Sequence, residues 1–351
     1  MKIGLLTYHH STNIGAMMQT YATCRALKEL GHEVVIVDIR QPEKQHHGIM
    51  KIVVDVVYFK RNKDVERFKK DFYPPLTNRY YTINELRKDP PKVDCLVVGS
   101  DQTWNPDISK ELAMAYFLDF GPDSVKRISY ASSFGTERWE QSDALTKEAD
   151  KALHKLNCLS VRESTGVDIC SNVFGLDAKL VVDPTLLFEN YNEITGNVRE
   201  RDELLCYKLR RDENFYTNIE NLKNSIGLPA RLLNNLTPQK GLRYKYPPSV
   251  AEWIEHIGGA RFVLTDSFHG VAFSLLYKRQ FAVIRCHDGR DSRFEDLLKE
   301  LGIKNRVFDN MQEMIHSKCY EKKIDYLVVE PKLQQIRELS WSYLKTALND
   351  K

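Results

Sequence analysis

The hexapeptide Thr265-Asp266-Ser267-Phe268-His269-Gly270 combines residue types that can transfer a proton and bind an anion. It follows an apolar run that begins at Arg261 and precedes a helix-like stretch from Val271 to Tyr277. A strand, a polar turn and a helix start place an imidazole beside backbone N–H groups that favour anions. We therefore predict an anion site at Ser267 and Gly270 with His269 as proton donor. The alternative is a histidine with a structural role only.

Polar motifs also follow most of the strands predicted in the first half of the chain. They are Tyr8 to Ala16, Gly99 to Trp104, Ser132 to Gly135, Arg162 to Glu163 and Asp183 to Thr185. Ligands of open α/β sheets bind outside the carboxyl ends of the strands. We expect these motifs and the 265–270 turn to converge on one cleft between two domains.

The first motif is a candidate phosphate cradle. Asn13 and Gly15 stand at the start of a predicted helix, where a glycine lets a phosphate approach the backbone closely. A turn that merely caps the helix is the alternative. The chain contains neither a G-x-G-x-x-G nor a Walker sequence after this strand, so a dinucleotide or P-loop site has little support.

The second motif suits a sugar. Ser100, Asp101 and Gln102 carry side chains that hydrogen-bond hydroxyl groups. Trp104 offers an apolar face for stacking on a sugar ring, and core packing is its alternative role.

Arginines supply the positive charge that an anionic substrate requires. Arg162 follows a strand with a buried pattern, where a guanidinium is costly unless it is paired. It either clamps a carboxylate or phosphate or pairs with Glu163 or another acidic neighbour. Arg285, Arg290 and Arg293 form a second basic cluster, and Arg293 opens a helix from which it can reach an anion.

Two familiar kinds of site have no support. The chain lacks a G-x-S-x-G elbow, so Ser267 beside His269 is a poor hydrolase triad. His9-His10 and His46-His47 lack metal-ligand spacing with cysteine or carboxylate residues, so we predict no metal.

The elements that must position these residues alternate between strand and helix, which predicts parallel sheets covered by helices. The expected strands are residues 2–8, 33–38, 93–98, 127–131, 158–161, 178–182, 203–209, 230–234 and 281–284, with a helix at 16–30. The composition turns polar from Glu189 to Asp202, so we place the domain boundary near residue 190. The predicted division is 1–190, 191–330 and a C-terminal helix in 331–351 that packs back on the first domain.

Composition excludes several classes of protein. The 351 residues exceed what one core usually supports, which favours two domains. A net charge of +3, from 51 basic and 48 acidic side chains, gives no argument for nucleic-acid binding. The seven cysteines include no C-x-x-C pair, which argues against a disulfide scaffold or a zinc site.

The start of the chain and one internal segment bear on localisation. The sequence enters a strand at Lys2 without a charged leader, and no apolar run reaches about 18 residues, which favours a cytoplasmic protein. Residues 49–59 are apolar-rich and residues 60–70 are basic. This segment is either a helix that rests on anionic lipid at the inner face of the membrane or an ordinary surface helix.

In combination the motifs resemble the polysaccharide pyruvyltransferase family. The resemblance rests on Asn13 to Ala16, Val98 to Trp104, Ile128 to Gly135, Ser160 to Glu163, Val182 to Thr185 and Thr265 to Gly270, in family order. It implies two Rossmann-like domains in a GT-B-like arrangement with the active site in the cleft. It also implies transfer of a pyruvyl group from phosphoenolpyruvate to two hydroxyls of one sugar, which gives a cyclic ketal in exopolysaccharide or capsule biosynthesis. The acceptor implied is a saccharide, free or lipid-linked, and phosphoenolpyruvate is a co-substrate, so no cofactor is expected.

Residue roles follow from that implied reaction. Arg162, Arg293 and the helix start at Gly270 are candidates for the carboxylate and phosphate of phosphoenolpyruvate. His269 is the acid that protonates the methylene carbon, as the resemblance implies. Asp101 or Asp266 accepts the hydroxyl proton, and each is alternatively a turn former.

Two other functions remain open. A GT-B nucleotide-sugar glycosyltransferase needs an acidic residue to hold ribose, and residues 265–295 contain no clear motif of that kind, although Glu295 is a candidate. A non-catalytic protein that binds glycans or the membrane surface through residues 49–70 would not need His269.

Overall fold

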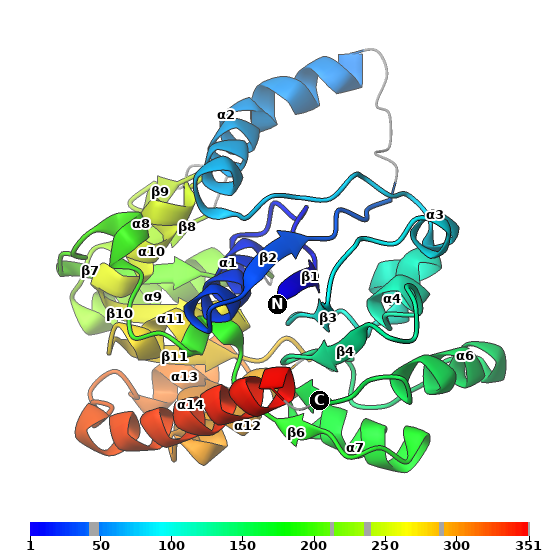
Figure 1. Cartoon of the computed structure of the whole chain (residues 1–351). Helices are drawn as coiled ribbons and strands as arrows, with labels where there is room; N and C mark the ends of the chain where they lie inside the picture. Colours follow the sequence, from blue (N-terminus) through cyan, green and yellow to red (C-terminus); the bar gives the residue numbers. More distant parts are fainter. Residues whose placement is uncertain (42–48, 211–213, 235–239, 288–290, 350–351) are drawn as a thin grey trace. The chain divides into compact units, whose positions relative to one another are not determined.

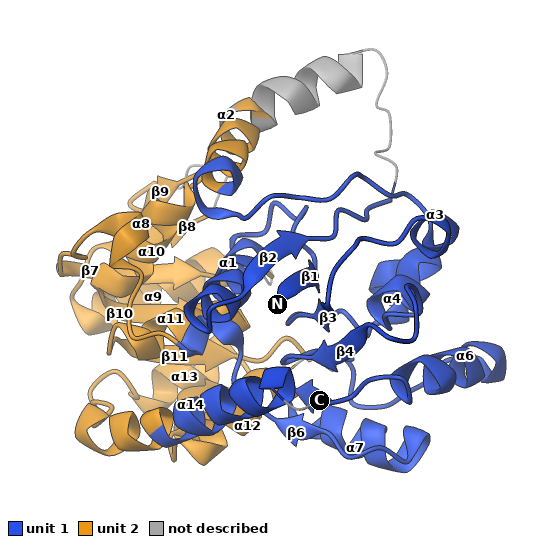
Figure 2. Cartoon of the chain, viewed as in Figure 1, with its two compact units in different colours: residues 1–48, 69–187, 335–351 blue, residues 49–68, 188–334 orange. Residues whose placement is uncertain are grey.

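The chain forms two compact units, which Figure 2 colours separately. The computed structural model describes residues 1–41, 49–210, 214–234, 240–287 and 291–349, with the backbone alone for residues 49–58 and 60. Unit 1 holds the described residues of Met1–Gly48, Lys69–Leu187 and Gln335–Lys351, and unit 2 holds those of Ile49–Phe68 and Phe188–Gln334. One boundary between the two units falls directly after Leu187 in the sequence. The assignment of residues 49–68 to unit 2 departs from the continuous first domain expected from sequence.

Unit 1 is built on parallel strands. They are β1 (Lys2–Leu6), β2 (Glu33–Ile36), β3 (Cys95–Val98), β4 (Lys126–Ser129), β5 (Ser160–Val161) and β6 (Lys179–Leu180). The first four form one sheet in the order β2-β1-β3-β4, and β5 pairs with β6. All four residues of the central strand β3 are buried apolar side chains, as expected for a parallel strand that is covered on both faces.

Isolated bridges extend this sheet at both ends. Ile36 pairs with Leu76, and Ile39 with Tyr80, beyond β2; Ile128 pairs with Cys158 beyond β4. The full order is then residues 76–80, β2, β1, β3, β4, β5 and β6. This is the strand order of a Rossmann fold, in which the order reverses between β1 and β3.

Helices connect the strands of unit 1 (Figure 1). They are α1 (Ile14–Glu29), α3 (Ile83–Lys88), α4 (Pro106–Ser109), α5 (Ala113–Tyr116), α6 (Asp143–Leu153) and α7 (Ser164–Phe174), with the 3₁₀ turns η1 (Lys110–Leu112) and η2 (Pro184–Leu186). The Asn13 side chain caps α1 by accepting the Ala16 N–H at 3.3 Å, which satisfies one of the unpaired donors at the helix start.

Unit 2 repeats the same topology. Its parallel strands are β7 (Arg201–Tyr207), β8 (Ala230–Leu233), β9 (Arg243–Lys245), β10 (Ala260–Thr265), β11 (Gln280–Ile284) and β12 (Val307–Phe308). They lie in the order β12-β11-β10-β7-β8-β9, again a Rossmann order, which reverses between β7 and β10. The connecting helices are α8 (Asn192–Thr195), α9 (Phe215–Ile226), α10 (Val250–Gly259), α11 (Phe268–Leu276), α12 (Ser292–Glu300) and α13 (Met311–Ser317), with the turn η3 (Lys304–Arg306).

Each unit has its own hydrophobic core. In unit 1, Trp104, Tyr116 and Phe117 belong to the same core cluster as Leu96 and Val98 of β3. In unit 2, Phe215 and Ile219 of α9 pack with Leu264 of β10. Helix α10 begins with a capping box, in which Ser249 and Glu252 each bind the other's backbone N–H at 3.2 and 2.9 Å.

Two long helices, α2 (Ile49–Phe72) and α14 (Tyr326–Asn349), contain residues of both units. The sequence places the start of the last helix at Pro331, but the helix begins at Tyr326 because the Asp325 side chain accepts the Leu327 N–H at 3.0 Å. Its C-terminal part packs within unit 1: Tyr343 donates to the Ser129 carbonyl at 2.9 Å, and Ser340 accepts from the Val182 N–H at 3.0 Å.

Candidate functional site

In unit 1 the first two motifs meet where the strand order reverses. Thr7 follows β1 and donates from its hydroxyl to the carbonyl of Ser100, which follows β3, at 3.0 Å. The Tyr8 hydroxyl donates to the Gln102 carbonyl at 3.1 Å. Open parallel sheets bind their ligands at this reversal, outside the carboxyl ends of the strands.

A buried network joins the motifs that follow β3, β5 and β6. Arg162 lies 3.0 Å from Asp183, 3.2 Å from Asp101 and 3.6 Å from Glu163, and 1% of its side chain is exposed. The Ser100 hydroxyl donates to Asp183 at 2.8 Å. Burial by itself lowers the pKa of Arg162, but the carboxylates of Asp101, Asp183 and Glu163 raise it overall, so the guanidinium stays charged.

The sequence offers two roles for Arg162: a clamp on a carboxylate or phosphate of the ligand, or a partner for acidic neighbours. The structure shows the pairing with acidic neighbours, which fixes the positions of Asp101 and Asp183. Because three carboxylates already balance its charge, Arg162 acts first as a positioning residue. Direct contact of Arg162 with a ligand stays a prediction.

Asp101 is the member of this network that solvent reaches. Its side chain is 19% exposed, and its Oδ1 accepts from Arg162 at 3.2 Å and from the Gln102 N–H at 3.0 Å. Its φ of +79° lies in the left-handed region, which costs a non-glycine residue about 1–3 kcal/mol. Hydrogen bonds from the Thr103 and Ser133 N–H groups to its carbonyl, at 2.7 and 3.0 Å, hold this conformation.

The structure places Trp104 in the core. The residue is fully buried, its Nε1 donates to the Tyr116 carbonyl at 3.2 Å, and its ring packs against Phe117 and Phe134. It has no exposed face on which a sugar can stack, so of its two predicted roles the structural one applies. The half-buried aromatic ring of this region is Trp139, which the sequence motifs did not identify.

The remaining candidates of unit 1 surround the same strand ends. Asn13 is exposed and caps α1, while Gly15 is buried as the second residue of that helix. Gln102 is buried, and its Oε1 accepts from Asn105 at 3.3 Å. The cap is what the structure shows for Asn13, and its contact with phosphate remains a prediction.

The sequence motifs did not identify a further cluster of charged side chains, which surrounds Asp38. His9, which is 1% exposed, lies 3.0 Å from Asp38, and Arg40 and Arg79 lie 2.9 and 3.0 Å from the same carboxylate. Burial alone raises the pKa of Asp38, but hydrogen bonds from His9, Arg40 and Arg79 lower it overall, well below its usual range. The adjacent His10 has its pKa lowered to about 4, chiefly by burial and then by His9, so it is neutral near pH 7. His9 stands in the first polar motif, but the sequence gives no sign that Asp38, Arg40 and Arg79 join it.

In unit 2 the predicted turn also lies where the strand order reverses, because β10 pairs with β7. Thr265 donates to the Tyr207 carbonyl at 2.8 Å and accepts from the Ser267 N–H at 3.1 Å. Ser267 caps α11 and accepts the Gly270 N–H at 3.5 Å. A Cβ on Gly270 would lie 2.3 Å from the Thr265 hydroxyl, so only glycine fits this helix start.

His269 is the second residue of the nine-residue helix α11 and is 8% exposed. Its ring packs edge-on against Phe268, with 5.4 Å between the centroids. The imidazole therefore stands in the first turn of a helix, where backbone N–H groups create a positive potential. This is the position that the sequence predicts for it.

Asp266 has a different role from the one proposed for a base. Its two carboxylate oxygens accept the N–H groups of Leu209 and Arg210 at 2.7 and 2.9 Å, and its side chain is fully buried. It therefore holds the segment that follows β7, which corresponds to the turn-forming alternative. Lys208, at the end of β7, lies 3.6 Å from Asp266 with its side chain 6% exposed, and the sequence motifs did not identify it.

In the second basic cluster, Arg285 is engaged in ion pairs with acidic side chains. Arg285 pairs with Glu295 at 2.6 Å and with Asp309, and these partners raise its pKa. Arg290 lies outside the described residues. Arg293 is half-buried in the first turn of α12, where it remains a candidate for the anion.

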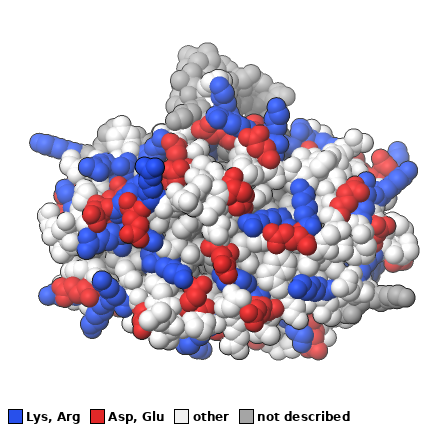
Figure 3. All heavy atoms as spheres, turned by 60° about the vertical axis from the view of Figure 1, so that its left-hand side comes forward, with Lys and Arg blue, Asp and Glu red and all other residues white. Residues whose placement is uncertain are grey.

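No group of three or more histidine, cysteine or acidic side chains in the described part of the chain is arranged to hold a metal ion. None of the described helices is long and apolar enough to cross a membrane. The side chains of residues 49–58, on which the lipid-contact prediction depends, lie outside the description. Figure 3 shows acidic and basic side chains interspersed on the face drawn.

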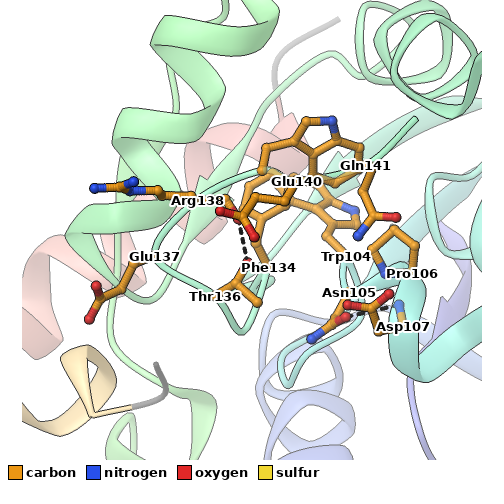
Figure 4. A pocket seen from close by; sticks show the side chains of 11 residues that line it. Trp104, Asn105, Pro106, Asp107, Phe134, Thr136, Glu137, Arg138, Glu140 and Gln141 are labelled. Carbon is orange, nitrogen blue, oxygen red and sulfur yellow. Dashed lines mark hydrogen bonds between the residues drawn. The ribbon is translucent and has the colours of Figure 1, made fainter. Parts of the chain in front are cut away.

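A pocket of about 420 Å³ in unit 1 is lined by residues that follow β3 and β4 (Figure 4). One wall consists of residues 104–107, which follow β3, and the other of residues 134–141, which follow β4. Ligand pockets commonly have volumes of about 300–1,000 Å³, so this one is large enough for a small molecule.

Solved structures share this fold over nearly the whole chain. A UDP-GlcNAc 2-epimerase from Methanocaldococcus jannaschii has a TM-score of 0.53 at 13% identity, over 97% of this chain and 100% of that one. A putative UDP-N-acetylglucosamine 2-epimerase from Listeria monocytogenes has a TM-score of 0.54 at 10% identity, over 100% and 97% of the two chains. The glycosyltransferase of kitacinnamycin gives 0.55 at 11% identity, over 97% and 95%. The protein thus has the GT-B fold, an α/β class with two Rossmann-like domains.

The family follows from the sequence itself. A model of the family described as polysaccharide pyruvyl transferase matches residues 13–288, which is more than half of the 351 residues. The chain belongs to this family, and the resemblance found in its motifs is confirmed. No curated protein sequence matches the chain.

Proposed function

We propose that this protein transfers the pyruvyl group of phosphoenolpyruvate to two hydroxyls of one sugar residue in a polysaccharide precursor, with release of phosphate. One observation supports this most: the family motifs follow the carboxyl ends of strands in both units, and those after β1, β3 and β10 lie where the strand order reverses. Those are the positions at which Rossmann-like sheets bind ligands.

Unit 2 has the features that an anionic donor needs. Phosphoenolpyruvate carries a carboxylate and a phosphate, and the N-terminus of α11 offers backbone N–H groups with Ser267 beside them. The Lys208 ammonium at the end of β7 adds a positive charge 3.6 Å from Asp266. Arg293, in the first turn of α12, is the second candidate cation. We assign the donor to this edge of unit 2.

The chemistry requires one proton donor and one activated hydroxyl. His269 gives a proton to the methylene carbon C3 of phosphoenolpyruvate while a sugar hydroxyl forms a bond to C2 and gives its proton to Asp101. The C2–O bond to phosphate then breaks, and phosphate leaves with the bonding electron pair. A second hydroxyl of the same sugar bonds to C2 and gives its proton to the departing phosphate, so the products are a cyclic ketal and inorganic phosphate.

Asp101 is the carboxylate that we assign to the acceptor. It is partly exposed at the end of β3, whereas both oxygens of Asp266 already bind backbone N–H groups. Arg162 keeps Asp101 ionised and in place through the 3.2 Å contact. An ionised, positioned carboxylate can accept the proton of a sugar hydroxyl.

The test is phosphate release from phosphoenolpyruvate with galactosides, glucosides and mannosides as acceptors, followed by NMR of the product. We expect release only when a suitable acceptor is present, together with a ketal methyl signal in the product. Turnover of a UDP- or GDP-sugar by the same preparation, without consumption of phosphoenolpyruvate, would overturn the proposal in favour of glycosyl transfer.

A further inference from the structure

The pocket between residues 104–107 and 134–141 has features of a carbohydrate subsite. Its polar lining includes Asn105, Asp107, Glu140 and Gln141, and Trp139 supplies an aromatic ring. Sugars present hydroxyls on their edges and C–H groups on their faces, so aromatic rings and carboxylate or amide groups together match them. We propose that this pocket binds a neutral sugar unit of the acceptor, next to the unit that receives the pyruvyl group. This inference rests on the proposed function.

The pocket and Asp101 share the same two chain segments. The isolated bridge between Asp101 and Ser132 and the 3.0 Å bond from the Ser133 N–H to the Asp101 carbonyl join these segments. Beyond this junction one segment continues to Asn105 and the other to Phe134. The walls of the pocket are therefore direct continuations of the turn that carries Asp101. A saccharide chain with one unit at Asp101 has its next unit within reach of the pocket.

Trp139 is held in place before any ligand binds. Its Nε1 donates to the Thr146 hydroxyl at 2.8 Å, and its ring meets the edges of Phe134 and Phe174 at centroid distances of 5.7 and 5.2 Å. The residue is nonetheless only half-buried. A ring that is already held in place loses little conformational entropy when a sugar stacks on its exposed part.

The charge of the lining favours neutral sugars. The residues that line the pocket include three acidic side chains, Asp107, Glu137 and Glu140, against one basic side chain, Arg138. An acidic sugar would place a carboxylate beside Asp107 and Glu140, and such like-charge contacts are unfavourable. The occupant that we infer is therefore a neutral hexose rather than a uronic acid.

The experiment measures binding first, without phosphoenolpyruvate. Neutral disaccharides of galactose, glucose and mannose, and matched disaccharides that contain glucuronic acid, are titrated into the full chain by calorimetry and saturation-transfer NMR. We expect at least one neutral disaccharide to bind and its glucuronate analogue to bind at least about tenfold more weakly. No binding by any neutral disaccharide, or equal binding of the acidic ones, would overturn the inference.

Substitutions then locate the binding. Trp139→Ala and Gln141→Ala should each weaken the disaccharide by roughly tenfold, equivalent to about 1.4 kcal/mol. Trp139→Phe should retain most of the affinity because it keeps an aromatic face. Glu148→Ala, which removes an exposed carboxylate on α6, is the matched control and should change nothing. Near-ultraviolet circular dichroism shows whether the Trp139 variants are folded, and Gln141→Ala tests the pocket without disturbing the aromatic cluster.

Transfer assays separate this inference from the proposed function. With an accepted sugar, Trp139→Ala should raise the KM of the two-unit acceptor about tenfold and leave the KM of the one-unit glycoside unchanged. If both acceptors are unaffected while transfer proceeds, the pocket inference is wrong and the proposed function stands. If Trp139-dependent disaccharide binding is found but no acceptor releases phosphate from phosphoenolpyruvate, the pocket inference stands and the proposed function is wrong.

Discussion

The carboxyl edges of the two sheets share a topology but use their polar residues differently. In unit 1, Arg162, Asp101, Asp183 and Ser100 bind one another, so most of their charge and hydrogen-bonding capacity positions the edge itself. In unit 2, the polar residues of one turn bind the backbone and shape a helix start that presents His269. The difference teaches that the first edge is a fixed polar surface, whereas the second is built around the imidazole of His269.

The largest expected effect therefore comes from unit 2. His269→Ala and His269→Gln should lower kcat by roughly 10²–10⁴, because they remove the proton donor. The KM of phosphoenolpyruvate should change little, since the helix N-terminus and Lys208 remain. Steady-state phosphate release and a thermal melt check this, with Thr82→Ala as the control that removes only the cap of α3 at a cost of about 1 kcal/mol. A His269→Gln variant with full kcat would contradict the assignment.

In unit 1 the largest effect should fall on stability. Arg162→Met should lower the free energy of unfolding by about 3–5 kcal/mol, because it leaves Asp183 and Glu163 buried without their counter-charge. Urea denaturation measures this loss. Arg138→Met, at an exposed position, is the control and should stay within about 0.5 kcal/mol of the parent. Equal unfolding midpoints for the two variants would show that the network does not stabilise this edge.

Asp101 of unit 1 and Asp266 of unit 2 should respond differently to the same substitution. Asp101→Asn should lower kcat by about 10² or more with little change in stability, because asparagine tolerates the left-handed φ of +79°. Asp266→Asn should instead lower the free energy of unfolding by about 1–3 kcal/mol, because one of the backbone N–H groups that it binds loses its acceptor. Paired kinetic and unfolding measurements on both variants test this. The reverse pattern would exchange their roles.

The smallest effect concerns Asp38 and appears in the pH dependence of stability. The folded-state pKa of Asp38 is lowered, so the ionised form stabilises the fold fully above the unfolded-state value of about 3.9. This contribution declines as the pH falls further. Asp38→Asn should thus lower the melting temperature at pH 7, and the gap from the parent should narrow below about pH 4. A gap that is constant from pH 7 to pH 3 would exclude ionised Asp38 as its cause.

The sequence predicts most strands and the positions of the motifs because apolar runs and turn residues are local signals. His269, Ser267 and Gly270 lie where the pattern places them, at a strand end and a helix start. The pattern does not distinguish Trp104, which is fully buried, from Trp139, which is partly exposed in the pocket lining, because burial depends on contacts between distant segments. A local pattern also does not predict that both Asp266 oxygens accept hydrogen bonds from the N–H groups of residues 209–210.

The central claim is that a proton reaches C3 of phosphoenolpyruvate before the sugar ketal is complete, and a reaction run in D₂O tests it most directly. The ketal methyl group of the product should carry a single deuteron, as seen by NMR and mass spectrometry, because the methylene carbon takes its third hydrogen from an exchangeable donor such as His269. A product that keeps an unprotonated methylene group, as an enolpyruvyl ether does, would contradict the account.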